Sequence, residues 1–300
     1  MSRLQTLNQE YDSNMPRQES IQFRSLGATI VGRMFFPRQE HPSPVVIICH
    51  GAFDYKEHFF ELAEDLAKEG IASLVLDMHG HGESGGQRYH VKMDEWLEDL
   101  RCALKYLRQR TDVVHEAVGA FGFSSGGTAV LEAAAEGLPL KALVTLDATV
   151  RSVLKWYESP FFRVASLLGR CKVMLGLKEV RLPLAFALSQ VRAAVDDNIN
   201  RAVIQDPYII EAYSRLPLPG SLECFEVDTL KRVGRVTCPV CVIHGARDEV
   251  DPPASAEMLF HRLRGDKALH ILPENGHMGH MDTQKREVLQ LTCQWFKNRL

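Results

Sequence analysis

The sequence predicts an α/β fold: a mostly parallel sheet with helices on both faces and an inserted helical lid. Short apolar runs rich in β-branched residues alternate with longer amphipathic runs, which is typical of strand–helix–strand units. The chain of 300 residues is long enough for one large domain with an insertion. Residues 151–235 pass between two predicted strands without this alternation, and that stretch is far longer than an ordinary connection.

The predicted strands are short, and most are apolar throughout. Residues 21–24 and 28–35 are expected to form an antiparallel opening pair, with Gly27 near the turn. The later runs suit strands that are covered on both faces. They cover residues 45–49, 72–76, 117–121, 142–146, 240–244 and 268–272.

Helical periodicity marks the segments between these strands. Residues 93–107 place apolar side chains at i, i+3, i+4 and i+7, with an acidic opposite side. Residues 59–67 keep one apolar face, and Gly70 supplies the C-cap. Further helices are expected at residues 125–136, 254–264 and 285–300.

The segment 151–235 contains apolar patches that are interrupted by Pro160, Gly169, Gly176 and Pro183. We interpret it as several short helices that form a lid over the carboxyl edge of the sheet. Most of its apolar residues are expected to pack as helix core, and some to line an acyl-binding cavity. The predicted division is a flexible tail at 1–20, a core at 21–150 and 236–300, and a helical cap at 151–235.

Composition excludes several classes of protein. The net charge of -3 and the lack of a dense Lys/Arg cluster argue against a nucleic-acid partner. No run of 18 uncharged apolar residues exists, so we expect no integral membrane segment. Because the polar N-terminus lacks the apolar core of a secretory signal, we expect a cytoplasmic protein. The oligomeric state stays open, a homodimer included.

The seven cysteines indicate reduced thiols rather than a disulfide framework. Their number is odd, and some, such as Cys49 and Cys102, fall inside apolar runs. Cys238 and Cys241 have CxxC spacing, but no second Cys or His pair follows at zinc spacing. We therefore expect no metal ion and no cofactor.

Ser124 is the predicted nucleophile. It is the serine of a G-x-S-x-G motif that lies between an apolar run at 118–123 and an Ala-rich helix, the strand–turn–helix context that this motif requires. Gly122 and Gly126 are expected where a side chain would clash. The turn should hold the hydroxyl at the sheet edge, beside the N-terminus of the helix. The alternative is a Gly/Ser turn without chemistry.

A serine hydroxyl needs a base to take its proton. His277 follows the last predicted strand and precedes the final helix, which is where a base belongs when the chain order is serine, acid, histidine. His280 is the competitor. We favour His277 because it lies closer to the strand end and follows Gly276.

The acid should follow the strand at 240–244, and Asp248 is the best candidate because it lies four residues past that strand. Its role would be to fix the tautomer of His277 and to stabilise the imidazolium. Asp251 and Glu249, further along the same loop, and Asp147, after the strand at 142–146, are the alternatives.

A developing oxyanion needs backbone N–H donors. We expect one donor from Ser125, directly after the nucleophile. The second is expected from Ala52, in the loop after the strand at 45–49, where small residues let the backbone approach the substrate.

Taken together, these residues resemble the α/β-hydrolase superfamily, and within it the group of monoacylglycerol lipases, lysophospholipases and serine aminopeptidases S33. The resemblance covers residues 20–300, and it implies the α/β-hydrolase fold and an esterase- or lipase-like activity. The matching landmarks are His50-Gly51-Ala52, a D-x-x-G-x-G-x-S loop at 77–84, the acid loop at 245–252 and Asn275-Gly276-His277.

The chain departs from the family pattern in two places. Members often carry G-H-S-M-G at the nucleophile, where this chain has Phe123 and Ser125 around Ser124. The lid shows no match beyond Asp206-Pro207. The resemblance therefore supports the fold and the triad better than the substrate.

The leading functional hypothesis is hydrolysis of a small-molecule acyl ester, such as a monoglyceride or lysophospholipid, through an acyl-enzyme. Thioester hydrolysis or acyl transfer with the same residues, and C–C bond hydrolysis, are alternatives. A peptidase is less favoured. A non-catalytic binding protein on this scaffold is also less favoured, because degraded triad positions would signal it and all three positions are filled here. Epoxide and haloalkane hydrolysis are disfavoured, because members of the fold with those activities carry Asp where Ser124 stands.

Overall fold

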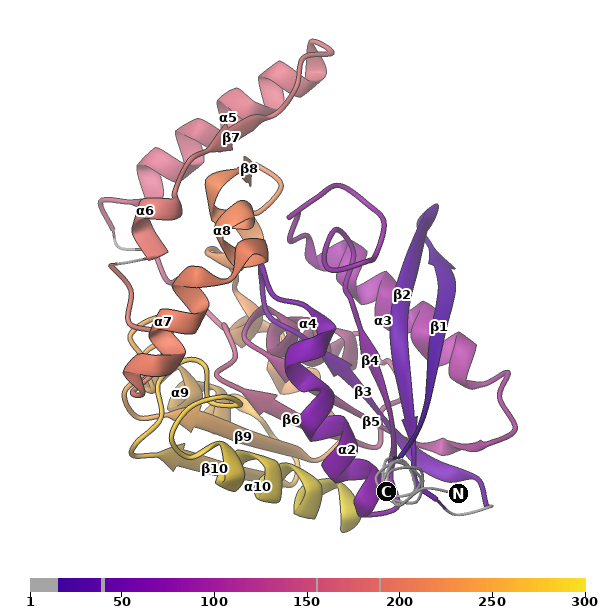
Figure 1. The fold of residues 1–300 in the computed structure, drawn as a ribbon. Helices are drawn as coiled ribbons and strands as arrows, with labels where there is room; N and C mark the ends of the chain where they lie inside the picture. Colours follow the sequence, from indigo (N-terminus) through magenta and orange to yellow (C-terminus); the bar gives the residue numbers. More distant parts are fainter. Residues whose placement is uncertain (1–15, 39–40, 155, 189) are drawn as a thin grey trace, which may run out of the picture.

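The computed structural model describes residues 16–38, 41–154, 156–188 and 190–300. An eight-stranded sheet runs through the molecule in the order β1-β2-β4-β3-β5-β6-β9-β10, with helices on both sides (Figure 1). Strand β2 pairs antiparallel with β1 and β4, and the remaining neighbours are parallel. The predicted fold class is therefore confirmed.

The strands lie close to the predicted positions. They are β1 (Arg17–Ser25), β2 (Ala28–Phe36), β3 (Ser43–Cys49), β4 (Ala72–Leu76), β5 (Val113–Phe123), β6 (Ala142–Leu146), β9 (Val240–Gly245) and β10 (Lys267–Leu272). Strand β1 begins four residues before the predicted start at 21, because the polar residues 17–20 pair with residues 33–36 of β2 along the sheet edge. Residues 17–20, which the prediction assigned to the flexible tail, therefore belong to the sheet. Residues 1–15 lie outside the described part of the chain.

Two apolar layers cover the sheet, one on each face. The helices α3 (Met93–Leu107), α4 (Ser125–Ala135) and α9 (Ala254–Arg262) pack in one layer. On the opposite face lie α2 (Phe60–Lys68), which follows the short 3-10 helix η1 (Lys56–Phe59), and α10 (Lys285–Lys297). Along β3, Ile47 belongs to the first layer and Ile48 to the second, as the alternation of side chains along a strand requires.

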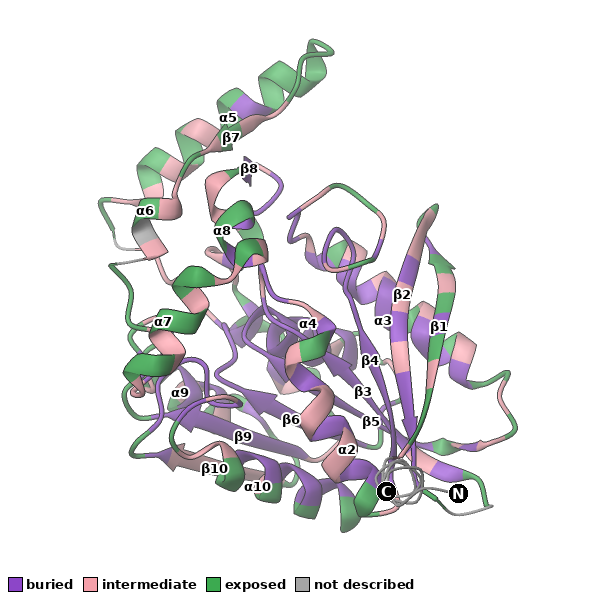
Figure 2. Ribbon diagram, in the orientation of Figure 1, coloured by how far each residue is buried: buried purple, intermediate pink, exposed green. Residues whose placement is uncertain are grey.

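Between β6 and β9 the chain leaves the sheet and forms an insertion. Its helices are α5 (Ser159–Met174), α6 (Ala185–Leu188), α7 (Asp197–Gln205) and α8 (Pro207–Ser214), followed by the 3-10 turns η2 (Leu222–Cys224), η3 (Thr229–Lys231) and η4 (Val233–Arg235). Strands β7 (Val180–Leu182) and β8 (Leu216–Leu218) pair antiparallel. Helix α5 projects away from the body of the molecule (Figure 1), and most of its surface is exposed (Figure 2).

Asp206 begins α8 and joins the insertion to the core. Its Oδ1 accepts hydrogen bonds from the backbone N–H groups of Tyr208 and Ile209, and Pro207 occupies the first helical turn, where a missing N–H costs nothing. Its Oδ2 accepts a hydrogen bond of 2.8 Å from the Tyr55 hydroxyl. The Asp-Pro landmark is thus a helix cap that also contacts the loop after β3.

The loop at 77–84 is organised by the buried Asp77. Its carboxylate accepts hydrogen bonds from the backbone N–H groups of Lys56 and Glu83 and from the Lys56 ammonium, at 2.8–2.9 Å. A Cβ on Gly82 would lie 1.9 Å from the Asp77 carboxyl carbon, so only glycine fits there. The D-x-x-G-x-G-x-S pattern is therefore structural in this chain.

All seven cysteines lie in the described part of the chain, and all are free thiols. Cys171, on α5, is exposed, whereas the others are buried or half-buried. Every helix among the described residues is too short or too polar to cross a bilayer.

Candidate active site

Ser124 occupies a sharp turn between β5 and α4. Its backbone has φ 50° and ψ -118°, a conformation that costs free energy in a residue with a side chain and is concentrated at functional sites. The backbone N–H of Ser124 donates to the carbonyl oxygen of Leu146 on β6, at 3.0 Å. This turn sets the serine at the carboxyl edge of the sheet, at the first turn of a helix.

The flanking glycines leave the room that this turn requires. A Cβ on Gly122 would lie 2.3 Å from the carbonyl oxygen of Gly126, and a Cβ on Gly126 would lie 2.4 Å from that of His50. Both separations involve backbone atoms and are far below van der Waals contact. The glycine spacing of the motif therefore follows from the close approach of β3, β5 and α4.

The structure brings together the serine, histidine and acid that the sequence singles out. His277 Nε2 lies 3.0 Å from Ser124 Oγ, and His277 Nδ1 lies 2.8 Å from Asp248 Oδ2. All three side chains are buried. They come from the ends of β5, β9 and β10, which meet at one edge because these strands are parallel.

His280 lies elsewhere. Its ring packs against Phe59 and Phe123, with centroids 4.5 and 4.6 Å away, and within the described chain neither ring nitrogen has a hydrogen-bond partner. Burial lowers the pKa of His280 to about 3. The histidine at hydrogen-bond distance from Ser124 is therefore His277.

The alternative acids have other partners. Asp251 Oδ2 accepts a hydrogen bond from the Thr149 hydroxyl at 2.6 Å. Asp147 accepts hydrogen bonds from the backbone N–H groups of Gly245 and Gly279, and Glu249 is exposed. Only Asp248, among these acids, is hydrogen-bonded to the His277 ring.

The carboxylate of Asp248 is fixed from two sides. Its Oδ1 accepts the backbone N–H groups of Val250 and Asp251, both at 2.8 Å, so Oδ2 is left to face His277. Burial alone would raise the pKa of Asp248, but the charge of His277 and hydrogen bonds from His244 and His277 hold it below its usual range. Burial disfavours a charged His277, yet Asp248 outweighs this and raises the pKa of His277 to about 9.

The two residues named as oxyanion donors lie beside the serine, and both line its cavity. Ser125 is the first residue of α4, where a backbone N–H has no partner within the helix. Ala52 lies in the loop after β3. That loop runs close to the nucleophile, since a Cβ on Gly51 would lie 3.2 Å from the Cβ of Ser124.

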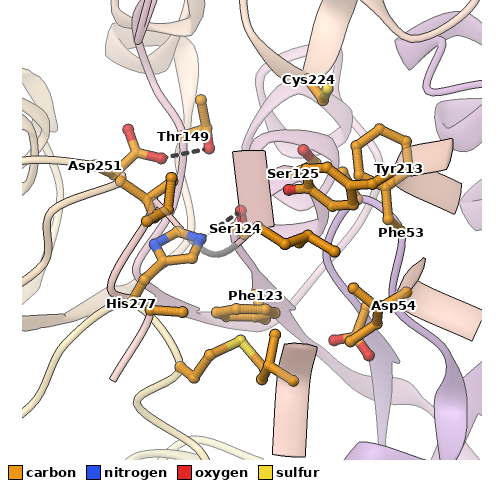
Figure 3. Close-up of a pocket in the computed structure, with 18 of the residues that line it drawn as sticks. Phe53, Asp54, Phe123, Ser124, Ser125, Thr149, Tyr213, Cys224, Asp251 and His277 are labelled. Carbon is orange, nitrogen blue, oxygen red and sulfur yellow. Dashed lines mark hydrogen bonds between the residues drawn. The ribbon is translucent and has the colours of Figure 1, made fainter. Parts of the chain in front are cut away.

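A cavity of about 180 Å³ opens above Ser124. Its polar end holds Ser124 and His277, with the hydrogen-bonded pair Thr149 and Asp251 beside them (Figure 3). Sequence reasoning did not identify Thr149, which carries no motif. The apolar wall comes mainly from the insertion and includes Val153, Leu188, Val191, Val203, Ile204, Ile209, Tyr213, Cys224 and Phe225.

Two groups of side chains in the described chain each bring three nitrogen or oxygen atoms within 4.8 Å of one another. They are Asp54, His58 and His280, and Asp147, His244 and Asp248. In the second group, both carboxylates are already hydrogen-bonded to backbone N–H groups. Serine-based chemistry requires no metal, and we assign none to either group.

A G-x-S-x-G turn and a buried serine–histidine–aspartate series at the carboxyl edge of a mostly parallel sheet define the α/β-hydrolase class. Residues 40–284 match the model of the family described as serine aminopeptidase, S33. The chain belongs to this family, and the resemblance inferred from the sequence is confirmed.

Known relatives span nearly the whole chain. A monoacylglycerol lipase from Mycolicibacterium smegmatis is 24% identical, over 91% of this chain and 95% of its own length. A polyketide transferase from Stachybotrys chlorohalonatus is 22% identical, over 94% and 97%. The crystal structure of an α/β hydrolase from Penicillium sp. superposes with a TM-score of 0.81 at 18% identity, over 94% of this chain and 99% of that one. The chain is thus an esterase- or lipase-like α/β-hydrolase.

Proposed function

We propose that this chain is a serine hydrolase that cleaves carboxylic esters through an acyl-enzyme. The observation that carries the proposal is the hydrogen-bonded series from Ser124 through His277 to Asp248, with separations of 3.0 and 2.8 Å. Ser124 and His277 line a cavity whose wall is mostly apolar. A polar reacting group and an apolar chain can therefore bind there together.

In the first step, His277 Nε2 takes the hydroxyl proton while Ser124 Oγ attacks the acyl carbon. Asp248 holds the imidazole in the tautomer whose Nδ1 carries the proton, and it stabilises the imidazolium that forms. The backbone N–H groups of Ala52 and Ser125 stabilise the negative charge on the carbonyl oxygen.

Collapse of this intermediate breaks the ester bond, and His277 gives its proton to the leaving alcohol. Water then enters and loses a proton to His277 as it attacks the acyl carbon. The second collapse releases the carboxylic acid and returns the proton to Ser124. Each residue thereby regains its starting protonation state.

The apolar wall indicates an acyl chain as the substrate part that binds in the cavity. Because residues 153–225 supply most of this wall, the segment 151–235 acts as a cap that selects the acyl group. A monoglyceride- or lysophospholipid-like ester fits this division between a polar end and an apolar wall. The predicted cytoplasmic location stays a prediction.

Acyl transfer is the second candidate function. It uses the same acyl-enzyme and differs only in the acceptor, which would be an alcohol or thiol instead of water. The similarity to a polyketide transferase over nearly the whole chain favours this candidate. Product analysis with an added alcohol acceptor separates the two, because hydrolysis yields only the free acid.

A fluorophosphonate probe and a panel of nitrophenyl esters test the proposal. The probe should modify Ser124, and Ser124→Ala should lose both labelling and esterase turnover. Ser20→Ala, an exposed serine on the edge strand β1, serves as the matched control and should keep both. Wild-type turnover by a folded Ser124→Ala protein would refute the proposal, and the chain-length profile of the panel measures the acyl pocket.

A further inference from the structure

His244 lies behind the proposed triad, at the end of β9. Its side chain is 1% exposed, so the hydrogen-bond partners of its ring nitrogens lie inside the protein. His244 Nε2 lies 2.8 Å from the backbone carbonyl oxygen of Asp251 and 3.2 Å from Asp248 Oδ2. A proton on Nε2 can therefore be donated to both acceptors.

The oxygen that His244 approaches is the one that also binds His277. His277 Nδ1 lies 2.8 Å from the same Asp248 Oδ2, while Oδ1 is taken by two backbone N–H groups. One carboxylate oxygen is thus shared by two imidazoles. Any charge on His244 reduces the electrostatic hold of Asp248 on the His277 imidazolium.

The groups that face His244 are mostly acidic. Asp147, after β6, has Oδ1 3.9 Å from His244 Nδ1, and Asp248 and Asp251 come from the loop after β9. His277, after β10, acts through Asp248. Burial opposes a charged His244, but the bond to Asp248 and the charge of Asp147 prevail and raise the pKa of His244 to about 9.

We propose that His244 is a positioning residue of the triad, which shares Asp248 Oδ2 with His277 and thereby sets how firmly His277 holds its proton. The inference rests on the proposed function, because it assigns His277 the role of base. In this arrangement a charged His244 weakens the pull of Asp248 on the His277 proton. His277 is then available as a base at a lower pH than it would be beside Asp248 alone.

Two substitutions separate charge from hydrogen bonding. His244→Gln removes the charge but keeps a side-chain N–H donor, and His244→Leu removes both. His270→Gln is the matched control, because His270 lies on the neighbouring strand β10 and is half-buried. The measurement is the rate of fluorophosphonate labelling of Ser124 as a function of pH, with thermal unfolding to confirm folding.

We expect the acid limb of the labelling rate to move to higher pH by about one unit in His244→Gln and in His244→Leu. Only His244→Leu should also lower the plateau rate, by about tenfold, and His270→Gln should match the wild type. A merely structural role would lower the unfolding temperature without moving the limb. If His244→Leu does not fold, His244→Gln alone decides.

The inference is overturned if folded His244→Gln keeps the wild-type limb. That result differs from failure of the proposed function, in which the wild-type protein itself would not be labelled at Ser124.

Discussion

The two halves of the insertion between β6 and β9 are joined to the core in different ways. The segment just before α7 is bonded to the loop that carries His277, because Asp282 accepts the backbone N–H groups of Val195, Asp196 and Gly276 at 2.7–2.9 Å. Met278 N–H also donates to the carbonyl oxygen of Ala193. Helix α5 instead projects into solvent (Figure 2), with Met174 84% exposed.

This difference separates two tasks within one insertion. Helices α7 and α8 line the cavity at Ser124. Every residue of α5 is described by the structure, and none of them lines this cavity. The cavity wall and the proposed base are therefore parts of one bonded unit, and α5 is an appendage to it. Substitutions should have large effects on the first and small effects on the second.

The largest effect is expected at Asp248, which is hydrogen-bonded to the proposed base His277. Asp248→Asn keeps the shape but favours the wrong tautomer of His277, so kcat should fall about 10⁴-fold. Turnover of a nitrophenyl butyrate ester measures it. Glu249→Gln, the exposed neighbour, is the control and should stay within about twofold. An Asp248→Asn protein that retains a tenth of the activity would contradict the assignment.

The hydrogen bonds that Asp282 makes between the segment before α7 and the loop that carries His277 are tested next. Asp282→Ala leaves backbone N–H groups of Val195, Asp196 and Gly276 without their acceptor, which should lower the free energy of unfolding by roughly 2–4 kcal/mol. Because Gly276 precedes His277, kcat should fall by about tenfold or more. Urea unfolding and ester turnover measure the two effects. Asp282→Asn keeps one acceptor oxygen and should give intermediate values. An Asp282→Ala protein with wild-type stability and turnover would show that other contacts join the segment before α7 to the loop that carries His277.

The pH dependence tests the charge state of the same loop. His277 acts as a base only when neutral, so kcat/KM should fall tenfold per pH unit below its pKa. Since Asp248 raises the pKa of His277 above the ordinary value of 6.5, the rate should still rise with pH above 6.5. A plateau that is already complete at pH 6.5 would contradict this expectation. The profile of kcat/KM in the free enzyme is the measurement.

The smallest effect is expected on α5. Met174→Ser, at the last residue of α5, and Leu175→Ser, directly after it, alter exposed side chains. The free energy of unfolding should therefore change by no more than about 0.5 kcal/mol, and turnover of short esters should not change. Ile209→Ala, on the cavity side of α8 and 6% exposed, is the contrasting variant and should cost roughly 2–4 kcal/mol. Equal costs at both sites would erase the distinction between the two halves.

The core could be predicted because its signals are local. The runs at 72–76 and 142–146 coincide with β4 and β6, since strands buried on both faces are continuously apolar. Strand β1 begins early because edge strands tolerate polar residues such as Arg17 and Gln18, which face solvent. The predicted start of β5 at 117 is four residues late, because the exposed His115 and Glu116 interrupt the apolar run that begins at Val113.

The insertion was less predictable in detail. Helix α6 spans only four residues and β7 and β8 three each, which is too short for a periodic pattern to register. The serine, acid and base positions follow from chain order and strand ends, whereas His244 reads as the last residue of a strand. Its approach to Asp248 depends on the turn at Gly245, and no sequence pattern encodes that distance.

The exposed thiol of Cys171, on α5, allows site-specific chemical labelling of the protein. Burial raises the pKa of Cys241 and Cys293 to about 12, so these thiols are unreactive at neutral pH. Cys171 is the exposed member of the seven. A maleimide dye should therefore attach to Cys171 without any substitution. Its fluorescence would report changes in the surroundings of α5 while ester turnover is measured in the same sample.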